Sequence, residues 1–357
     1  MRAMQSDYMH WAKFKPPVRF ALTTSEVPHF RMDSLPITIA DLDMDGASHP
    51  RYAPLLERIA RRYSVATDQV VSADGTSMAN FLAMATVISP GDEVLIESPA
   101  YELLLGTASF LGARIRRFER KAKDGFRLDV ALIEQALTPQ TRLIVITNLH
   151  NPTSMLAGEA ELSAVGDLAA SIGAVVLVDE VYLDAAVPPE RSAVHLGPQF
   201  IVTNSLTKVY GLSGLRCGWI LADPELAERM WRLNDLFGVN RAHQAERLGC
   251  IAFDNLDKVV GDNPAILKAN RARFNAFVMK RPDLDCIAAE HGITAFPRWR
   301  GGDTQRLDDH LRKHYDASVV AGRWFELPEH FRIGFGLAPE DFEAGLIRLE
   351  KALDDLG

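Results

Sequence analysis

The sequence predicts an α/β protein with a large domain, built on a mostly parallel, doubly wound sheet, and a smaller α+β domain. Three observations carry this prediction. The chain has 357 residues, which is long enough for two domains. Between about residues 70 and 220, short apolar runs alternate with helical patterns. After residue 223 this alternation gives way to helical patterns mixed with short strand patterns.

Six apolar runs are the expected strands of the large sheet. They are short, rich in β-branched residues and apolar on both faces, which is typical of strands covered by helices on both sides. They comprise residues 70–72, 94–96, 143–147, 174–178, 200–203 and 218–221. The direction of the last strand stays open, because the connection that leads to it has no clear type.

Helical patterns lie between these runs and continue beyond them. In the first part of the chain they cover residues 77–88, 129–137 and 159–172. Later patterns cover residues 225–236, much of 241–279, 308–314 and 339–353. Asn263-Pro264 marks a break or a helix start. Strand patterns at 294–296 and 331–333 make the C-terminal part α+β.

Composition narrows the class of protein. The formal net charge is −8, with no basic stretch, which disfavours nucleic-acid and anionic-membrane binding. The three cysteines are far apart and form no CxxC pair, so neither a metal centre nor a disulfide framework is expected. The first residues lack a signal-type apolar core, and no apolar run approaches the roughly 18–20 residues of a membrane span. We therefore expect a cytoplasmic protein.

In an open parallel sheet, ligands bind beyond the carboxyl ends of the strands, so the residues that follow each strand form the candidate site. Gly75, Thr76 and Ser77 follow the first strand and open a helix, a natural place for a phosphate. An ordinary helix cap is the competing interpretation. Tyr101 follows the second strand and is suited to stacking on a flat ring, although a half-buried tyrosine is the commoner structure.

The third and fourth strands end in an amide and a carboxylate. Asn151 can donate to a ligand oxygen, but Asn-Pro is also a plain turn signal. Asp179 ends an apolar strand, where an unpaired carboxylate is costly, so it requires a cation, a metal or a ring N–H. Tyr182 follows it within the same motif.

The fifth strand leads to a lysine between hydroxyl groups. Lys208 follows Ser205 and Thr207 and precedes a glycine-containing turn and Arg216. A partly desolvated lysine has a lowered pKa and acts as a nucleophilic amine. Ser205 and Arg216 supply donors suited to a phosphate. A solvated loop lysine is the commoner alternative, but it fits these neighbours badly.

The groups that follow these five strands fit pyridoxal 5'-phosphate. Its aldehyde needs the lysine, and its pyridinium N–H needs the carboxylate. Its phenolic oxygen needs amide and tyrosine donors, and its phosphate needs helix amides and an arginine.

These residues resemble those of fold type I pyridoxal-phosphate enzymes of the class I/II aminotransferase family. The resemblance runs in order from about residue 74 to residue 219 and resumes around Arg332. Its most specific pieces are residues 205–208 with Gly211 and Arg216, then 148–153 and 179–182. It implies a large cofactor-binding domain over residues 42–250, a small domain built from residues 1–41 and 251–357, and active sites at a homodimer interface.

The resemblance also implies a role for each motif residue. Lys208 is expected to hold the cofactor as a Schiff base and to shuttle the proton, and Asp179 to hold the pyridine nitrogen. Arg332 is expected to clamp the substrate α-carboxylate, beside Asn151. The expected donors to the phenolic oxygen are Asn151 and Tyr182, the stacking ring is Tyr101, and the phosphate cradle is Gly75, Thr76, Ser77, Ser205 and Arg216.

The sequence departs from the family pattern at three places. Ser154 stands where the family usually has glycine, and Leu149 where it often has proline. Tyr52 is a weak match to the family tyrosine that reaches the phosphate of the neighbouring subunit.

We therefore expect an aminotransferase that acts on an amino acid and a 2-oxo acid. A lyase, cyclase or decarboxylase with the same cofactor is the alternative, because the substrate pose decides which bond breaks. The SxxK pattern at 205–208 lacks the companion motifs of serine acyl-transfer enzymes, and no GxxxxGK[ST] loop supports an ATPase. The donor and acceptor stay open; candidates for contacting the substrate side chain are Arg298, Arg300, His29 and Arg31.

Overall fold

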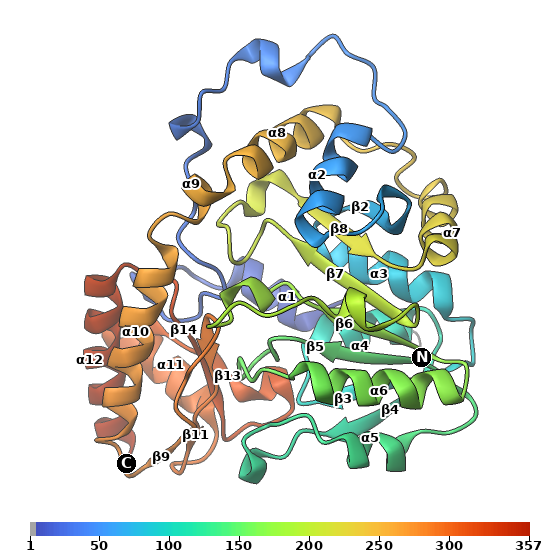
Figure 1. The fold of residues 1–357 in the computed structure, drawn as a ribbon. Helices are drawn as coiled ribbons and strands as arrows, with labels where there is room; N and C mark the ends of the chain where they lie inside the picture. Colours follow the sequence, from blue (N-terminus) through green and yellow to red (C-terminus); the bar gives the residue numbers. More distant parts are fainter. Residues whose placement is uncertain (1–4) are drawn as a thin grey trace.

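The computed structural model describes residues 5–357 and is built around a seven-stranded sheet (Figure 1). The strand order is β2-β8-β7-β6-β5-β3-β4. The strands are β2 (Val70–Asp74), β3 (Glu93–Ser98), β4 (Arg114–Glu119), β5 (Thr141–Thr147), β6 (Val175–Asp179), β7 (Phe200–Ser205) and β8 (Cys217–Leu221). Strands β7, β6, β5, β3 and β4 are parallel, whereas β8 is antiparallel to both β2 and β7. This settles the direction that the sequence left open.

All six predicted strands form, and their burial explains why their pattern could be recognised. Every residue of β7 and β8 is buried, because helices cover both faces of the sheet. The strand of this sheet that the sequence reasoning missed is β4, whose residues alternate between exposed and partly or fully buried positions. It lies at the sheet edge and is rich in arginine, and charged edge strands carry no apolar run that a pattern search would find.

Two groups of helices enclose the sheet. Helix α3 lies across β2, β8, β7 and β6 and contacts α4 and α7, whereas α6 packs on β6 and contacts α5. Figure 1 shows α6 in front of the sheet and α3 behind it. The helices of this part are α2 (Ala53–Tyr63), α3 (Gly75–Val87), α4 (Glu102–Phe110), α5 (Val130–Ala136), α6 (Glu159–Ser171), α7 (Pro224–Asn234) and α8 (His243–Asp254).

The C-terminal part combines helices with short strands, as its pattern predicts. Its helices are α9 (Leu256–Val260), α10 (Asn263–Val278), α11 (Thr304–Tyr315) and α12 (Pro339–Leu356). Its strands are β9 (Leu284–Asp285), β10 (Thr294–Ala295), β11 (Arg298–Trp299), β12 (Ala317–Ser318), β13 (Val320–Ala321) and β14 (Phe331–Gly334). Helix α12 contacts α10 and α11, and β14 lies between β10 and β13.

The start of the chain joins this C-terminal part. After α1 (Asp7–Phe14), strand β1 (Phe20–Ala21) pairs in parallel with β12 and contacts α12. The expected boundary at residue 250 falls inside α8, which packs on α2 and β8. The division into 42–250 and 1–41 with 251–357 stays a prediction, and residues 1–4 of it lie outside the described residues.

A glycine lets the N-terminal segment lie directly against β14. The Gly334 amide donates to the Leu22 carbonyl at 2.8 Å. A Cβ atom at Gly334 would lie only 1.7 Å from the Thr24 carbonyl oxygen, so no larger residue fits there. This contact brings residues from the beginning of the chain next to Arg332, two positions earlier on the same strand.

Within residues 5–357, no helix combines the length and the apolar character that crossing a membrane requires.

Candidate active site

A cavity of about 750 Å³ lies at the carboxyl ends of the central strands. Its volume is in the range of small-molecule sites, about 300–1,000 Å³. The predicted site residues that line it are Thr76, Ser77, Tyr101, Asn151, Asp179, Tyr182, Lys208, Arg216 and Arg332. Gly75 and Ser205 lie directly behind this lining, where they contact Arg216 and Thr76. The strand-end reasoning therefore leads to one cavity.

One end of the cavity is suited to a phosphate. Gly75 opens α3 with a φ of +75°, and a Cβ atom there would lie 2.4 Å from the Arg216 guanidinium. The Thr76 hydroxyl donates to Ser205 Oγ at 2.7 Å. Within residues 5–357, no carboxylate lies within ion-pair distance of Arg216; Arg241 instead pairs with the nearby Asp74 at 2.9 Å. A helix N-terminus, hydroxyl groups and an unpaired guanidinium form an anion cradle.

A buried carboxylate lies in the middle of the cavity wall. Asp179 ends β6, is 4% exposed, and accepts from the Val181 amide at 3.1 Å and from Asn80 Nδ2 at 2.8 Å. Burial raises the pKa of Asp179 to about 6, although the Asn80 hydrogen bond and the Lys208 charge act in the opposite direction. Among the described residues no cation is close enough to form an ion pair with it, so a ligand N–H would complete its environment.

Lys208 faces the same cavity from the loop after β7. Its Nζ atom lies 3.4 Å from Ser25 Oγ, and burial lowers the pKa of its ammonium group, which favours the nucleophilic amine. The Lys208 carbonyl accepts from the Val27 amide at 2.9 Å, and the Gly211 carbonyl accepts from the Phe30 amide at 3.0 Å. The N-terminal segment therefore holds the lysine loop in place.

Arg332 is a buried guanidinium without an acidic partner. It is 2% exposed, and it donates to Asn151 Oδ1 at 3.0 Å and to the Tyr8 hydroxyl at 3.1 Å. Its Nε atom has no hydrogen-bond partner, and no carboxylate in residues 5–357 pairs with it. Because a buried guanidinium forms its strongest contacts with a carboxylate, this position is suited to an acidic ligand.

Aromatic side chains close the cavity beside these polar groups. Tyr101 lies edge-on to Tyr8 with 5.8 Å between ring centroids, and its hydroxyl lies 3.2 Å from Met9 Sδ. Burial raises the pKa of Tyr182 to about 12 and that of Tyr101 well above its usual value. Both hydroxyls are therefore neutral near pH 7 and can donate.

The sequence reasoning missed several lining residues and proposed others that lie elsewhere. The missed residues include Ser6, Tyr8, Met9 and Lys13 on or beside α1, Ser25 in the following segment, and Asn80 on α3. A polar Asn80 among apolar α3 residues was a usable signal; Tyr8 had none, because only the folded chain brings it to Arg332. The proposed side-chain contacts Arg298, Arg300, His29 and Arg31 do not line this cavity.

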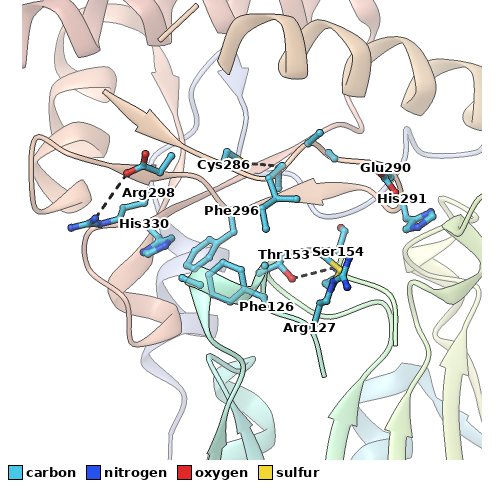
Figure 2. Close-up of a pocket in the computed structure, with 18 of the residues that line it drawn as sticks. Phe126, Arg127, Thr153, Ser154, Cys286, Glu290, His291, Phe296, Arg298 and His330 are labelled. Carbon is cyan, nitrogen blue, oxygen red and sulfur yellow. Dashed lines mark hydrogen bonds and ion pairs between the residues drawn. The ribbon is translucent and has the colours of Figure 1, made fainter. Parts of the chain in front are cut away.

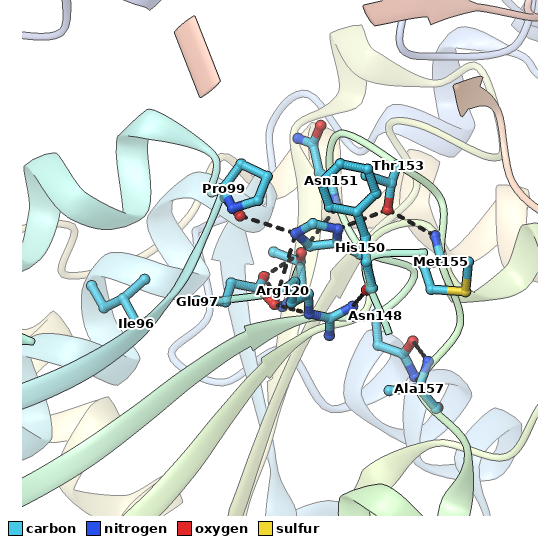
Figure 3. Close-up of polar contacts among 12 residues, drawn as sticks. Ile96, Glu97, Pro99, Arg120, Asn148, His150, Asn151, Thr153, Met155 and Ala157 are labelled. Carbon is cyan, nitrogen blue, oxygen red and sulfur yellow. Dashed lines mark hydrogen bonds and ion pairs between the residues drawn. The ribbon is translucent and has the colours of Figure 1, made fainter. Parts of the chain in front are cut away.

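A buried ion pair supports the loop that carries Asn151 (Figure 3). Arg120 Nε lies 2.9 Å from Glu97 Oε2, and both side chains are inaccessible to solvent. The other Glu97 oxygen accepts from the amide and the hydroxyl of Thr147, whose hydroxyl accepts from the Asn151 amide at 3.0 Å. His150 completes the arrangement through the Pro99 carbonyl at 3.0 Å.

The family departure at Ser154 has a structural counterpart in the same loop. Ser154 adopts a φ of +59°, a conformation that glycine adopts most easily. Its hydroxyl compensates by forming hydrogen bonds with the Thr294 hydroxyl at 3.0 Å and the Thr294 amide at 3.2 Å. The serine therefore ties the Asn151 loop to β10.

A second cavity, of about 670 Å³, lies between this loop and residues 284–298. Its lining includes Phe126, Cys286, Phe296 and His330, and Figure 2 shows the Phe126 and Phe296 rings next to His330. Arg298, a predicted candidate for contacting the substrate side chain, lines it, but none of the predicted catalytic or cofactor-binding residues does. Among residues 5–357, no group of His, Cys, Asp or Glu side chains is arranged to hold a metal ion.

Known proteins resemble this chain over most of its length. The family model described as aminotransferase class I and II matches residues 45–349. Capreomycidine synthase of Streptomyces vinaceus is 30% identical over 288 residues, which cover 80% of this chain and 74% of that protein. A probable aspartate/prephenate aminotransferase of Aquifex aeolicus is 26% identical over 302 residues, which cover 81% and 76%.

Solved structures share the fold. A pyridoxal-phosphate-dependent aminotransferase from Streptococcus suis has a TM-score of 0.93 at 22% identity, covering 100% of this chain and 99% of that chain. The pyridoxal-phosphate-dependent cyclase OrfR has a TM-score of 0.89 at 24% identity, covering 100% of both chains.

The buried ion pair predicts a large loss of stability when one partner is removed. Arg120→Met should lower the free energy of unfolding by about 3–5 kcal/mol, because it leaves the buried Glu97 carboxyl group without its cation. Adding Glu97→Gln should recover part of this loss. Arg116→Met is the control: its side chain is 44% exposed and lies 3.7 Å from Glu93, so about 1 kcal/mol or less is expected. Denaturant unfolding measures these losses in the wild type, Arg120→Met, the double variant and Arg116→Met. Equal losses of stability in Arg120→Met and in the double variant would contradict the assignment.

The raised pKa of Asp179 predicts how stability depends on pH. The folded value of about 6 exceeds the ordinary value of 3.8, so its stabilising contribution is complete below pH 3.8 and is lost as pH rises through 6. Between about pH 4 and pH 7, the ligand-free wild type should lose about 2 kcal/mol relative to Asp179→Asn. Thermal and denaturant unfolding of both proteins over this pH range would test this prediction. Stability profiles of the wild type and Asp179→Asn that run parallel across the range would contradict it.

Proposed function

The chain belongs to the class I and II aminotransferase family, and we propose that it is an aminotransferase moving an amino group between an α-amino acid and a 2-oxo acid. The cofactor of this family, and of this chain, is pyridoxal 5'-phosphate. The observation that carries the proposal is the arrangement of Lys208, Asp179 and Arg332 around one cavity. These three groups are an amine, an acid and a carboxylate receptor, which amino-group transfer requires.

The donor set fits the cofactor. The space beside Gly75, which a Cβ atom would fill, together with Thr76, Ser77, Ser205 and Arg216, would hold the phosphate. Asp179 would meet the ring nitrogen, which supplies the donor that this carboxylate lacks. Tyr101 would pack on the ring, and Asn151 and Tyr182 would donate to the phenolic oxygen.

Lys208 would carry the cofactor and the proton. Bound pyridoxal phosphate supplies a carbonyl group that reacts with amines and a ring that accepts electrons. Burial favours the neutral amine of Lys208, which can take a proton from the substrate α-carbon. A carboxylate at Asp179 would keep a proton on the ring nitrogen throughout.

Arg332 would bind the substrate α-carboxylate. Its guanidinium is held by Asn151 and Tyr8, and it has no internal acid to compete with a ligand. The substrate side chain would then extend toward Met9 and Lys13 of α1, which line the same cavity.

A second reaction is a specific candidate. Capreomycidine synthase is the 30% identical relative, and the OrfR structure is named a cyclase. A cyclase would use the same lysine and carboxylate but break a different bond after α-proton removal. A lyase or a decarboxylase is the broader form of this alternative.

We also propose that the chain acts as a homodimer in the cytoplasm. The large exposed apolar side chains Ile39, Met44, Leu236 and Phe237 lie on two segments that the Asn240–Ser48 hydrogen bond of 3.1 Å connects. Tyr52 lies near this surface, 5.1 Å from the His243 ring, and its contact with a partner's phosphate stays a prediction. The expected ligands are small amino and oxo acids, not nucleic acid or membrane.

One set of measurements tests the function and separates the two reactions. The protein with pyridoxal phosphate should show a visible absorption band that Lys208→Ala shifts or abolishes. Incubation with a panel of amino acids should convert the band to that of the aminated cofactor and release a 2-oxo acid. Ammonia or a cyclic amino acid, with the band retained, would identify the lyase or cyclase instead. A wild type that binds no cofactor would overturn the proposal.

A further inference from the structure

A polar residue interrupts the buried face of α3. Asn80 is 5% exposed and lies among the buried residues Ala79, Leu82, Ala83 and Met84. The helix crosses β6 and β7, and Asn80 lines the same cavity as Asp179. A buried amide is costly unless it is hydrogen-bonded, so its partners indicate why it is there.

Asn80 connects residues on two neighbouring strands. Asp179 on β6 and Thr203 on β7 are partners in the parallel ladder. Asn80 Nδ2 donates to Asp179 Oδ2 at 2.8 Å, and the Thr203 hydroxyl donates to Asn80 Oδ1 at 2.6 Å. All three side chains are buried, so solvent does not compete for these bonds.

The directions of these hydrogen bonds select one state of the carboxylate. An ionised carboxylate only accepts, so it needs the NH₂ end of the amide. The Thr203 hydroxyl binds the oxygen end and thereby favours this orientation of Asn80. A reversed amide would place its oxygen against Asp179, which only a protonated carboxyl group could accommodate.

We propose that Asn80, oriented by Thr203, is a positioning residue that keeps Asp179 ionised and directed at the ring nitrogen of pyridoxal phosphate. This inference rests on the proposed function, since it requires the ring nitrogen to lie at Asp179. When Asp179 stays ionised, the shared proton resides on the ring nitrogen, and the protonated ring accepts electrons better.

Among the groups around Asp179, Asn80 contributes most to keeping the carboxylate ionised. The titratable groups that face it are Lys208, Glu180, Tyr101 and Tyr182. Among the influences that lower the pKa of Asp179 against burial, the Asn80 hydrogen bond is the largest, ahead of the Val181 amide and the Lys208 charge. Loss of the amide would therefore move the proton from the ring toward the carboxylate.

The experiment uses holoenzyme loaded with pyridoxal phosphate labelled with nitrogen-15 in the ring. In the wild type, the nitrogen resonance should be that of a protonated pyridine. Asn80→Leu and Thr203→Val should move it toward the unprotonated position, whereas Thr203→Ser, which keeps the hydroxyl, should retain the wild-type position. With the amino acid that the wild type exchanges fastest, α-proton exchange should fall about 10- to 100-fold in Asn80→Leu, which is the size expected for losing one hydrogen bond to a charged group.

Thr86→Val is the matched control, because it removes a hydrogen bond from α3, between Thr86 Oγ1 and the Leu82 carbonyl, at a position six residues after Asn80. It should leave the resonance unchanged. If Asp179→Ala moves the resonance but Asn80→Leu and Thr203→Val do not, the inference is overturned and the proposed function stands. If Asp179→Ala leaves the resonance unmoved, the ring does not lie at Asp179 and the proposed function fails. Should Asn80→Leu not fold, the Thr203→Val and Thr203→Ser pair decides.

Discussion

A carboxylate buried at the end of an apolar strand must be compensated, and this constraint organises the centre of the molecule. Asp179 receives one bond from the Val181 amide and one from Asn80, but no internal cation pairs with it among the described residues. The sheet register places Thr203 beside it, and α3 supplies the amide that joins the two. A buried charge without a full set of partners destabilises the ligand-free fold, and in the proposed function a bound ring N–H would satisfy it. In the proposed function, the stability of the ligand-free protein and cofactor binding would therefore oppose each other at Asp179.

The N-terminal segment completes the site through its contacts with the Lys208 loop and with Arg332. Its backbone binds the Lys208 loop at Val27 and Phe30, while Tyr8 binds Arg332. Strand β14 can lie against this segment because Gly334 has no side chain. Lys208 and Arg332 thus belong to different parts of the chain but share one N-terminal support. Residues of α1 also line the cavity next to this support.

The groups proposed to react and the walls of the cavity determine different properties of the protein. In the proposed function, Lys208, Asp179 and Arg332 would carry the chemistry shared by the family that the chain belongs to, whose members include relatives named an aminotransferase and a synthase. The bond that breaks depends on the substrate pose, which the walls control. The Asn151 loop is one such wall. The buried Glu97–Arg120 pair and the Ser154–Thr294 contact both hold this loop, so buried contacts rather than solvent determine its position.

What the sequence determined by itself was local. Strands covered on both faces are continuous apolar runs, so six strands of the sheet could be located, and the residues after them could be assigned to one edge because parallel strands share their carboxyl ends. Strand β4 escaped because its pairing at the sheet edge requires no apolar run. Tertiary structure alone decided the antiparallel direction of β8, the approach of Tyr8 and Ser25 to the site, and the Thr203–Asn80–Asp179 chain. These depend on contacts between residues distant in sequence, and no local pattern encodes which distant side chain will complete a buried polar group.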